Sequence, residues 1–274
     1  MKIVFFGTSS FAAHILRYLI QENVEILAIV TRPDRPRGRS LHASAPPVKE
    51  LALSLPLDIP VYQPEKASTE EFAKVLKTLD PDLFVVVAYG EIIKKNLLDI
   101  PKKGCINSHA SILPKYRGAA PMQRCLMEGA KETGITIIKM AEQMDAGDII
   151  KIAKTSIQEG MTLGELEDKL RALSCPLLME VLRAFEQGPV KGLPQDHSQA
   201  TFAPKITPEE EMIDWNQPAE KLLCLICALS PFPGAWCSLR VGNEQKRLKI
   251  KRAKLVEALS GNPGEILAFG KEGW

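Results

Sequence analysis

An asparagine and a histidine two positions apart could act together on a carbonyl group. Asn107 and His109 close an apolar run that begins at Gly104. In a strand, residues two positions apart share a face, so the amide and the imidazole are expected side by side. Such a pair can hold the oxyanion that forms when a nucleophile attacks a carbonyl carbon. The alternatives are a structural histidine with satisfied hydrogen bonds and an asparagine that forms a turn.

A carboxylate further along the chain could complete this pair. Asp145 lies in the sequence Met-Asp-Ala-Gly-Asp, which on its own is an ordinary turn. Close to His109, a carboxylate would favour the charged imidazole and could relay a proton through a water molecule. The Gly- and Pro-containing stretch 110–121 is expected to form a shaped loop next to these groups.

These side chains need a framework, and the first half of the chain alternates short apolar runs with helical periods. Nearly continuous apolar strands are buried on both faces, which is typical of a parallel sheet covered by helices. We therefore predict an α/β fold with a doubly wound, mostly parallel, Rossmann-like sheet and a ligand site beyond the carboxyl ends of its strands. The main expected strands are residues 2–6, 24–30, 83–88 and 104–108.

The rest of the chain predicts an antiparallel pair, a long helix and a second domain. The pair is expected at 133–140 and 148–155, and the helix begins with a capping box at Thr162. We predict a catalytic domain at 1–188, a Gly- and Pro-rich linker at 189–206 and a small β-rich, OB-like domain at 207–274. In the second domain, a helix is expected near 218–229 and strands near 235–241, 247–256 and 265–269.

Composition and missing motifs exclude several classes of protein. The 274 residues are 45% hydrophobic and 25% charged, which is enough apolar material for a folded core. No apolar run is long enough to span a membrane. The loop after the first strand has one glycine, so a dinucleotide-binding fingerprint is absent. Cys224 and Cys227 lie in a helical pattern and are interpreted as core residues, not zinc ligands. The lack of a disulfide framework suits a reducing cytoplasm.

Cations are concentrated in two places, although the net charge is only +2. The stretch from position 240 to position 254 contains seven basic residues and one acidic residue, and cations alternate there with Leu248 and Ile250. This alternation predicts a basic strand face that could contact RNA phosphates. The alternative is a solvated edge strand that lysines protect from aggregation. The predicted RNA-binding residues are Arg32, Arg35, Arg37 and Arg39 in the first cluster and Arg247, Lys249 and Lys251 in the second.

Together these motifs resemble the formyltetrahydrofolate-dependent formyltransferases. The resemblance extends from residue 1 to about residue 264, and its most specific parts are Arg-Gly-Ala-Ala-Pro at 117–121 and Arg-Pro-Asp-Arg-Pro at 32–36. Within the family, the chain is most similar to the members that act on aminoacylated initiator transfer RNA. The matching segments are 7–12, 31–36, 86–90, 107–109, 111–121, 144–148 and 213–215.

The resemblance implies an activity and a set of site residues. It implies transfer of a formyl group from 10-formyltetrahydrofolate, without a metal, to the amino group of methionyl initiator tRNA for translation initiation. It also implies a cytoplasmic monomer that does not use a membrane. Asn107, His109 and Asp145 would be catalytic. The residues implied for the folate site are Tyr89, Gly90, Ser111, Ile112, Leu113 and Pro114.

Some alternatives and departures from the family pattern remain. A related enzyme could formylate an amino sugar nucleotide or a glycinamide nucleotide, or could hydrolyse the formylfolate, and a non-enzymatic RNA-binding protein is the alternative outside enzymes. Ser108 and Ala110 replace the Val and Gly that are more usual in the family, and we expect activity to be retained. The loop 35–44 lacks the usual Lys-Lys pair, so the resemblance assigns no detailed RNA contacts there. The family usually continues beyond position 274, so the second domain is expected to be incomplete.

Overall fold

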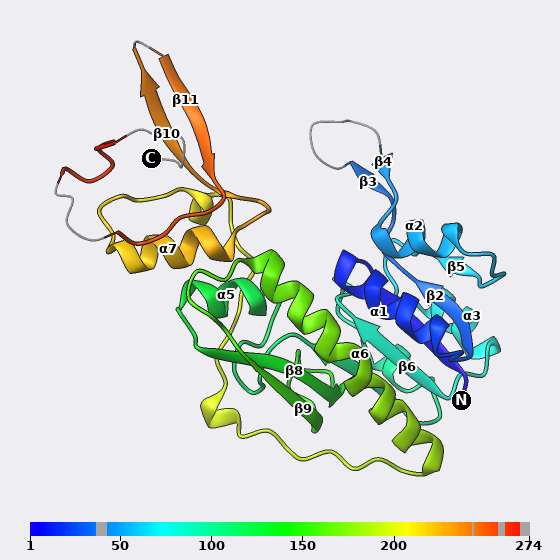
Figure 1. Ribbon diagram of the computed structural model, residues 1–274. Coiled ribbons are helices and arrows are strands. Elements are labelled where there is room, and N and C mark those ends of the chain that lie inside the picture. The colour runs from blue at the N-terminus through cyan, green and yellow to red at the C-terminus, as the bar shows by residue number, and fades with distance from the viewer. Residues whose placement is uncertain (37–42, 243, 257–260, 269–274) are drawn as a thin grey trace.

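The computed structural model describes residues 1–36, 43–242, 244–256 and 261–268, and its centre is a seven-stranded sheet (Figure 1). The strand order is β5-β2-β1-β6-β7-β8-β9. The first five strands in this order run parallel, whereas β8 and β9 are antiparallel to their neighbours. The predicted mostly parallel sheet and its antiparallel pair are therefore confirmed. The strands are β1 (Ile3–Gly7), β2 (Ile26–Val30), β5 (Val61–Tyr62), β6 (Leu83–Val87), β7 (Cys105–His109), β8 (Glu132–Lys139) and β9 (Ile149–Ser156).

Helices cover both faces of this sheet because the strands present apolar side chains on both faces. In β1, Ile3 and Phe5 pack into the cluster that contains α1 and α6, and Val4 and Phe6 pack into the cluster of α3 and α4. All four side chains are fully buried. This is the two-sided burial expected of a parallel sheet. The helices of this domain are α1 (Ser10–Gln21), α2 (Pro47–Ser54), α3 (Glu70–Thr78), α4 (Lys95–Leu98), α5 (Pro121–Met127) and α6 (Leu163–Gln187).

The long helix α6 begins at the predicted capping box. The Thr162 hydroxyl accepts a hydrogen bond from the Glu165 backbone N–H at 3.3 Å, and the Glu165 carboxylate accepts one from the Thr162 N–H at 2.8 Å. These bonds satisfy donors that a helix start leaves unpaired. The bond from the Thr162 backbone is the main reason that the pKa of Glu165 lies below its usual range.

The C-terminal part consists of helix α7 (Ala219–Ala228) and an antiparallel hairpin of β10 (Ala235–Val241) and β11 (Glu244–Ile250). A small core joins them, with Ile226, Leu229 and Ala235 buried. The strand predicted at 247–256 ends at Ile250. The strand predicted near 265–269 is not found in the described residues 265–268, which are all exposed and have no neighbouring strand to complete a backbone ladder.

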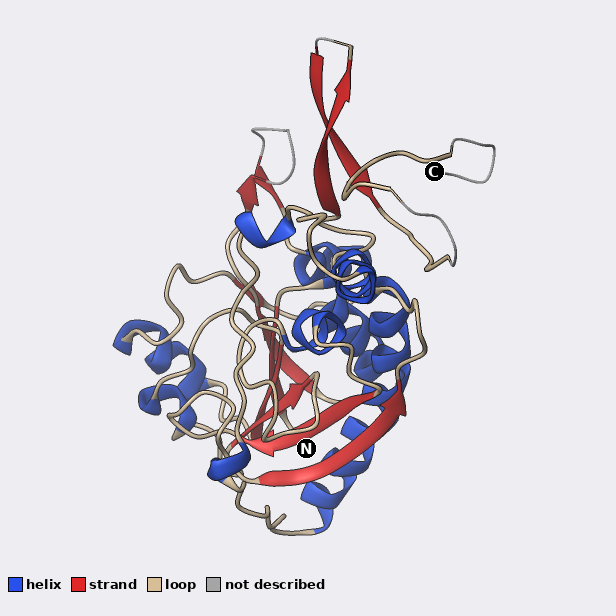
Figure 2. Ribbon diagram, turned by 90° about the vertical axis from the view of Figure 1, so that its left-hand side faces the viewer, coloured by secondary structure: helices blue, strands red, loops and turns tan. Residues whose placement is uncertain are grey.

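Two strand pairs project from the same side of the molecule. One is the β10–β11 hairpin, and the other is the short pair of β3 (Arg35–Pro36) and β4 (Ala43–Ser44), which follows the carboxyl end of β2 (Figures 1 and 2). Within the described ranges, no helix combines the length and the apolar character that crossing a membrane would need.

Ser108, one of the two departures from the family pattern, points away from Asn107 and His109 and meets helix α6. Its Oγ lies 2.9 Å from the Oγ of Ser174, and both side chains are buried. Each hydroxyl can act as donor or acceptor, so the pair satisfies itself inside the core. The serine in β7 therefore has a matched partner in α6.

We expect Ser108→Ala and Ser174→Ala each to lower the free energy of unfolding, because each leaves one buried hydroxyl without its partner. The double variant should lose less than the sum of the two single losses, with a coupling of about 1 kcal/mol. Urea unfolding of the four proteins measures this coupling. Additive losses would show that the two hydroxyls do not stabilise one another.

Candidate functional site

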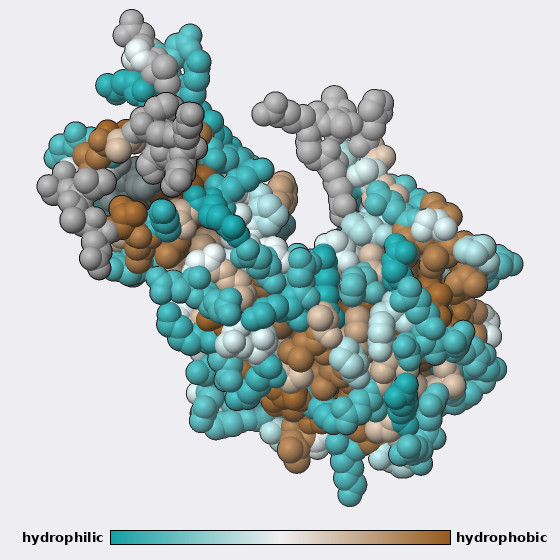
Figure 3. Space-filling view, in the orientation of Figure 1, coloured by the Kyte–Doolittle hydropathy of each residue, from teal (hydrophilic) through white to brown (hydrophobic). Residues whose placement is uncertain are grey.

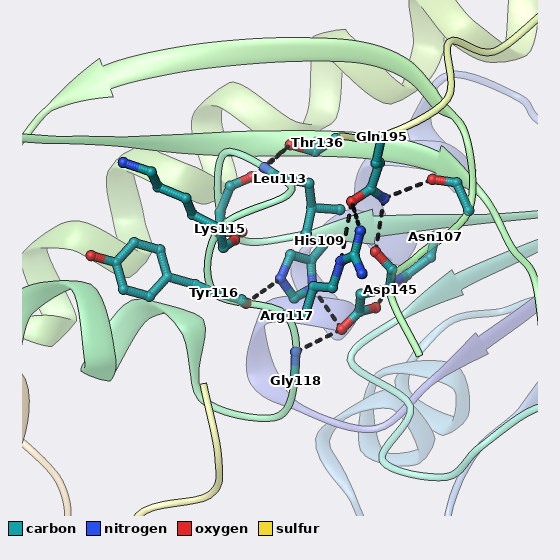
Figure 4. Close-up of polar contacts among 12 residues, drawn as sticks. Asn107, His109, Leu113, Lys115, Tyr116, Arg117, Gly118, Thr136, Asp145 and Gln195 are labelled. Atoms are coloured by element: carbon teal, nitrogen blue, oxygen red, sulfur yellow. Dashed lines mark hydrogen bonds and ion pairs between the residues drawn. The ribbon is translucent and has the colours of Figure 1, made fainter. Parts of the chain in front are cut away.

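The carboxylate of Asp145 lies at the centre of the three predicted catalytic residues (Figure 4). Its Oδ1 accepts a hydrogen bond from Asn107 Nδ2 at 3.2 Å, and its Oδ2 lies 3.5 Å from His109 Nδ1. The backbone N–H of Gly118 donates to Oδ2 at 2.8 Å. The structure thus brings Asn107, His109 and Asp145 together. The strand alternation places the first two on one face, and the turn between β8 and β9 supplies the third.

Both nitrogens of the His109 ring face hydrogen-bond acceptors. Nε2 lies 2.9 Å from the backbone carbonyl oxygen of Tyr116, which can only accept, so Nε2 carries a proton. Nδ1 faces the Asp145 carboxylate. The side chain is only 6% exposed. A second proton, on Nδ1, would have the Asp145 carboxylate as its acceptor, so the ring needs no change of orientation to hold it.

Backbone strain is concentrated next to these contacts. Asp145 and Tyr116 have positive φ angles of 50° and 60°, which residues with a Cβ rarely adopt. Gly118 has a φ of 125°, and a Cβ at this position would lie 2.7 Å from the carbonyl oxygen of Ala203. The loop that reaches His109 and Asp145 therefore requires glycine at its closest approach to the segment after α6.

The stretch predicted to line the folate site divides into inward and outward residues. Ser111 and Leu113 are buried. The hydroxyl of Thr136 donates to the Ser111 carbonyl at 2.7 Å and accepts from the Leu113 N–H at 3.1 Å. Ser111 and Leu113 therefore attach the loop to β8 through Thr136. Ile112 and Pro114 are half-buried and present their side chains nearer the surface.

Tyr89 and Gly90 differ in the same way. Tyr89 is 2% exposed and packs edge-on against Phe6, so its side chain belongs to the core. Burial raises the pKa of its phenol, whose oxygen has no hydrogen-bond partner among the described residues. Gly90 is exposed, has a φ of 86° and has open space where a Cβ would lie. Tyr89 and Gly90 follow the end of β6, and Gly90 can offer only its backbone to a ligand there.

The two members of the first basic cluster that the structure describes, Arg32 and Arg35, form ion pairs within the protein. Arg32 donates to the Glu91 carboxylate at 2.6 Å, and the other oxygen of Glu91 accepts from the Ala67 N–H at 2.9 Å. Arg35 forms an ion pair with Glu65 at 2.6 Å, and both side chains are mostly exposed. Arg32 thus ties together loops at the carboxyl edge. The other two predicted cations, Arg37 and Arg39, lie outside the described residues.

The second basic cluster forms the predicted strand face. Leu248 and Ile250 are half-buried against α7, whereas the cations between and after them are exposed. The Arg247 guanidinium stacks 4.0 Å above the Trp236 ring, and the Lys249 ammonium lies 6.0 Å from the Phe232 ring, which is 78% exposed. Figure 3 shows hydrophilic residues along this hairpin. Arg247, Lys249 and Lys251 therefore lie on a solvent-facing surface that also carries aromatic rings.

Arg117 and Gln195 are part of the site although sequence reasoning did not assign them a role. Both are buried, and their side chains are hydrogen-bonded to one another at 2.6 Å. Arg117 belongs to the specific Arg-Gly-Ala-Ala-Pro motif, which was a signal that could have identified it. Gln195 comes from the aperiodic segment predicted as a linker, where no pattern marks it.

No metal centre is found in the part of the chain that the structure describes. In those ranges, no group of three or more His, Cys, Asp or Glu side chains is arranged to bind an ion. Cys224 and Cys227 lie on α7 as free thiols, and Cys227 is buried. This agrees with the interpretation of the C-x-x-C as part of a helix that packs on the core.

Comparisons with known proteins agree with the fold and identify the family. The family model described as formyl transferase matches residues 1–182, and the model described as formyl transferase, C-terminal domain, matches residues 205–274. The chain therefore belongs to the formyl transferase family, and it is an enzyme of the formyltransferase class.

Its relatives include named methionyl-tRNA formyltransferases. The protein of Protochlamydia amoebophila (strain UWE25) is 52% identical over 271 residues, which cover 99% of this chain and 85% of the relative. The protein of Moorella thermoacetica is 44% identical over 275 residues, which cover 100% of this chain and 86% of the relative.

Solved structures share the fold at lower identity. HypX from Aquifex aeolicus, in complex with tetrahydrofolic acid, matches with a TM-score of 0.67 and 21% identity over 99% of this chain and 41% of that chain. The N-formyltransferase from Helicobacter canadensis, in complex with folinic acid and dTDP-3-aminofucose, matches with a TM-score of 0.70 and 18% identity over 95% and 90%.

The buried phenol of Tyr89 gives a direct test of the folate residues. We expect Tyr89→Phe to leave the KM for formyltetrahydrofolate unchanged, because the hydroxyl lies in the core. The free energy of unfolding should stay equal or rise by about 1 kcal/mol, because a buried polar group without a partner is removed. Steady-state kinetics and urea unfolding measure both quantities. A tenfold higher KM would instead place the phenol in the folate site.

Proposed function

We propose that this enzyme transfers the formyl group of 10-formyltetrahydrofolate to the amino group of methionine esterified to initiator transfer RNA. The observation that carries the proposal is the Asp145 carboxylate, which joins Asn107, His109 and the Gly118 N–H in one site. The similarity to methionyl-tRNA formyltransferases over nearly the whole chain supports this acceptor.

Asn107 is the group we assign to the formyl oxygen. Its Nδ2 carries two hydrogens, and the bond to Asp145 uses one of them. The other can donate to the oxygen of the formyl group as the amine attacks and negative charge develops there. Because the amide is already held by Asp145, little reorganisation is needed when that charge appears.

His109 and Asp145 are the groups we assign to proton transfer. The new bond joins the amine nitrogen to the formyl carbon, and the bond from that carbon to the folate nitrogen breaks. The attacking amine must lose one proton, and the departing folate nitrogen must gain one. With both ring nitrogens of His109 protonated, Asp145 can take the first proton through a water molecule, and the proton on Nε2 can go to the folate nitrogen when substrate displaces the Tyr116 carbonyl. The ring then keeps its Nδ1 proton, and the proton held by Asp145 can return through water to Nε2, which restores both groups.

For the transfer RNA, we propose the exposed face of the β10–β11 hairpin as the contact surface. Arg247, Lys249 and Lys251 can neutralise phosphates, and the nearby rings of Trp236 and Phe232 can pack against bases or riboses. Arg32 and Arg247 are assigned smaller shares than Lys249 and Lys251, because Glu91 lies 2.6 Å from Arg32 and Glu211 lies 3.5 Å from Arg247.

We also propose that the enzyme acts in the cytoplasm and as a monomer. All six cysteines are free thiols, which suits a reducing compartment. Light scattering after gel filtration would give the mass of the species in solution, and a stable dimer would contradict the monomer.

The decisive experiment supplies 10-formyltetrahydrofolate with one acceptor at a time. We expect formylated methionyl initiator tRNA from methionyl-tRNA, and no product from an amino sugar nucleotide or a glycinamide nucleotide. Free formate in the absence of any acceptor would identify a hydrolase. Formylation of a nucleotide-linked amine, with methionyl-tRNA left unreacted, would overturn the proposed acceptor.

Removing the amide of Asn107 should slow the chemical step. We expect Asn107→Ala to lower kcat on the order of 100-fold and to change folate affinity by only a few-fold, because the contact strengthens in the transition state. Single-turnover formylation and folate titration separate the two effects. Asn216→Ala, in an exposed turn of the C-terminal part where the side chain contacts Asp214, is the matched control. A near-normal single-turnover rate would remove Asn107 from the mechanism.

Removing two cations from the hairpin should weaken RNA binding in a salt-dependent way. We expect the double substitution Lys249→Ala and Lys251→Ala to reduce the slope of log affinity against log salt by up to about 0.9 for each phosphate that is no longer neutralised. All transfer RNAs should be affected alike, because phosphate contacts carry no sequence information. Filter binding at several salt concentrations measures the slope, with Lys74→Ala on α3 as control. An unchanged slope would contradict the assignment of this surface.

A further inference from the structure

The segment that follows α6 runs directly across the two loops of the catalytic site. At one end, Leu193 and Ile149 exchange backbone hydrogen bonds of 2.8 Å in each direction. At the other end, the Arg117 N–H donates to the Thr201 carbonyl at 2.9 Å, and the Ala203 N–H donates to the Arg117 carbonyl at 2.7 Å. The segment is therefore fixed to β9 and to the loop after β7 at the same time.

Gln195 lies between these two attachments and uses both ends of its amide. Its Nε2 donates to the backbone carbonyls of Asp145, at 2.8 Å, and Gly147, at 2.7 Å. Its Oε1 accepts from Arg117, at 2.6 Å from Nη2 and 3.2 Å from Nε. The side chain is 5% exposed. Both amide hydrogens and the oxygen are thus satisfied by protein groups (Figure 4).

Gln195 joins two loops, one of which faces Nε2 of the His109 ring and the other Nδ1. Arg117 lies between Tyr116, whose carbonyl faces Nε2 of His109, and Gly118, whose N–H binds the Asp145 carboxylate. Asp145 itself has a positive φ, which is unfavourable for a residue with a Cβ and needs surrounding bonds to hold it. Gln195 donates a hydrogen bond to the backbone carbonyl of Asp145 itself.

We infer that Gln195 is a positioning residue for formyl transfer, which rests on the function proposed above. It does not reach the reacting groups. It fixes the backbone of Asp145 and, through Arg117, the loop that carries the Tyr116 carbonyl and the Gly118 N–H. The distance between the Asp145 carboxylate and His109 therefore depends on one glutamine that lies 50 residues beyond Asp145 in the chain.

A different role would be the simple anchoring of Arg117. The side chains that contact this buried guanidinium are Gln195 and His197, and Arg117 forms no ion pair with a carboxylate among the described residues. Gln195→Glu separates the two roles, because a carboxylate keeps an acceptor for Arg117 but cannot donate to the carbonyls of Asp145 and Gly147. Anchoring alone predicts an active variant, whereas positioning predicts an impaired one.

We expect Gln195→Glu to lower kcat by about 10- to 100-fold while the KM for formyltetrahydrofolate changes less than threefold, since a small misplacement of catalytic groups costs this much. Gln158→Glu, at an exposed glutamine, is the matched control and should behave like the wild type. Thermal unfolding identifies any loss of folded protein. If the glutamate variant does not fold, Gln195→Met, which removes the donors and the Arg117 acceptor together, takes its place in the double-variant cycle with Asp145.

A double-variant cycle tests the route of action. In an Asp145→Asn background, Gln195→Glu should cost at most threefold more, because the group that it positions is already disabled. An equal loss in both backgrounds, or normal turnover of Gln195→Glu, would overturn the inference. The cycle is run on whichever formyl product the wild-type enzyme releases, so a failure of the proposed RNA acceptor would appear in the wild type and would leave the test of Gln195 intact.

Discussion

The carboxylate of Asp145 is the interaction on which the site depends. It contacts an amide from β7, an imidazole from the end of the same strand and a backbone N–H from the following loop. These three groups lie between positions 107 and 118, whereas Asp145 lies at least 27 residues further along the chain. A carboxylate with two oxygens can receive all three only if the turn between β8 and β9 folds back over β7. The strained φ of Asp145 is the local consequence of that requirement.

The parts of the fold that follow from periodicity could be predicted from the sequence. The alternation in β7 places Asn107 and His109 on one face, and the same alternation sends Ser108 to the other face, toward α6. The capping box located the start of α6. These features depend on residues a few positions apart, so local physical rules determine them.

The parts that depend on contacts between distant residues could not be predicted in this way. Gln195 reaches Asp145 across 50 residues, and Ser108 meets Ser174 across 66. Both contacts join uncharged polar groups, and neither a hydrophobic period nor a charge pattern in the sequence marks such contacts. For the residues implied in the folate site, the degree of burial could not be predicted either. A motif marks Ser111 and Tyr89 but does not distinguish a side chain that points into the core from one that faces a ligand.

The two basic clusters illustrate how the surroundings of a charge decide its use. In the first, Arg32 is paired with Glu91, which also binds the Ala67 N–H, so the charge serves to join loops at the edge of the sheet. In the second, half-buried Leu248 and Ile250 attach the strand to its core and leave Lys249 and Lys251 exposed, whereas Arg247 lies 3.5 Å from the Glu211 carboxylate. A polyanion gains most from charges that no nearby carboxylate neutralises. Under the proposed function, the surroundings of each cation, and not only the number of cations, therefore determine how much it can contribute to RNA binding. The hairpin projects on the same side of the molecule as the β3–β4 pair, and its exposed lysines are not among the residues that contact Asp145, so substitutions there can change the proposed RNA contact without altering those contacts.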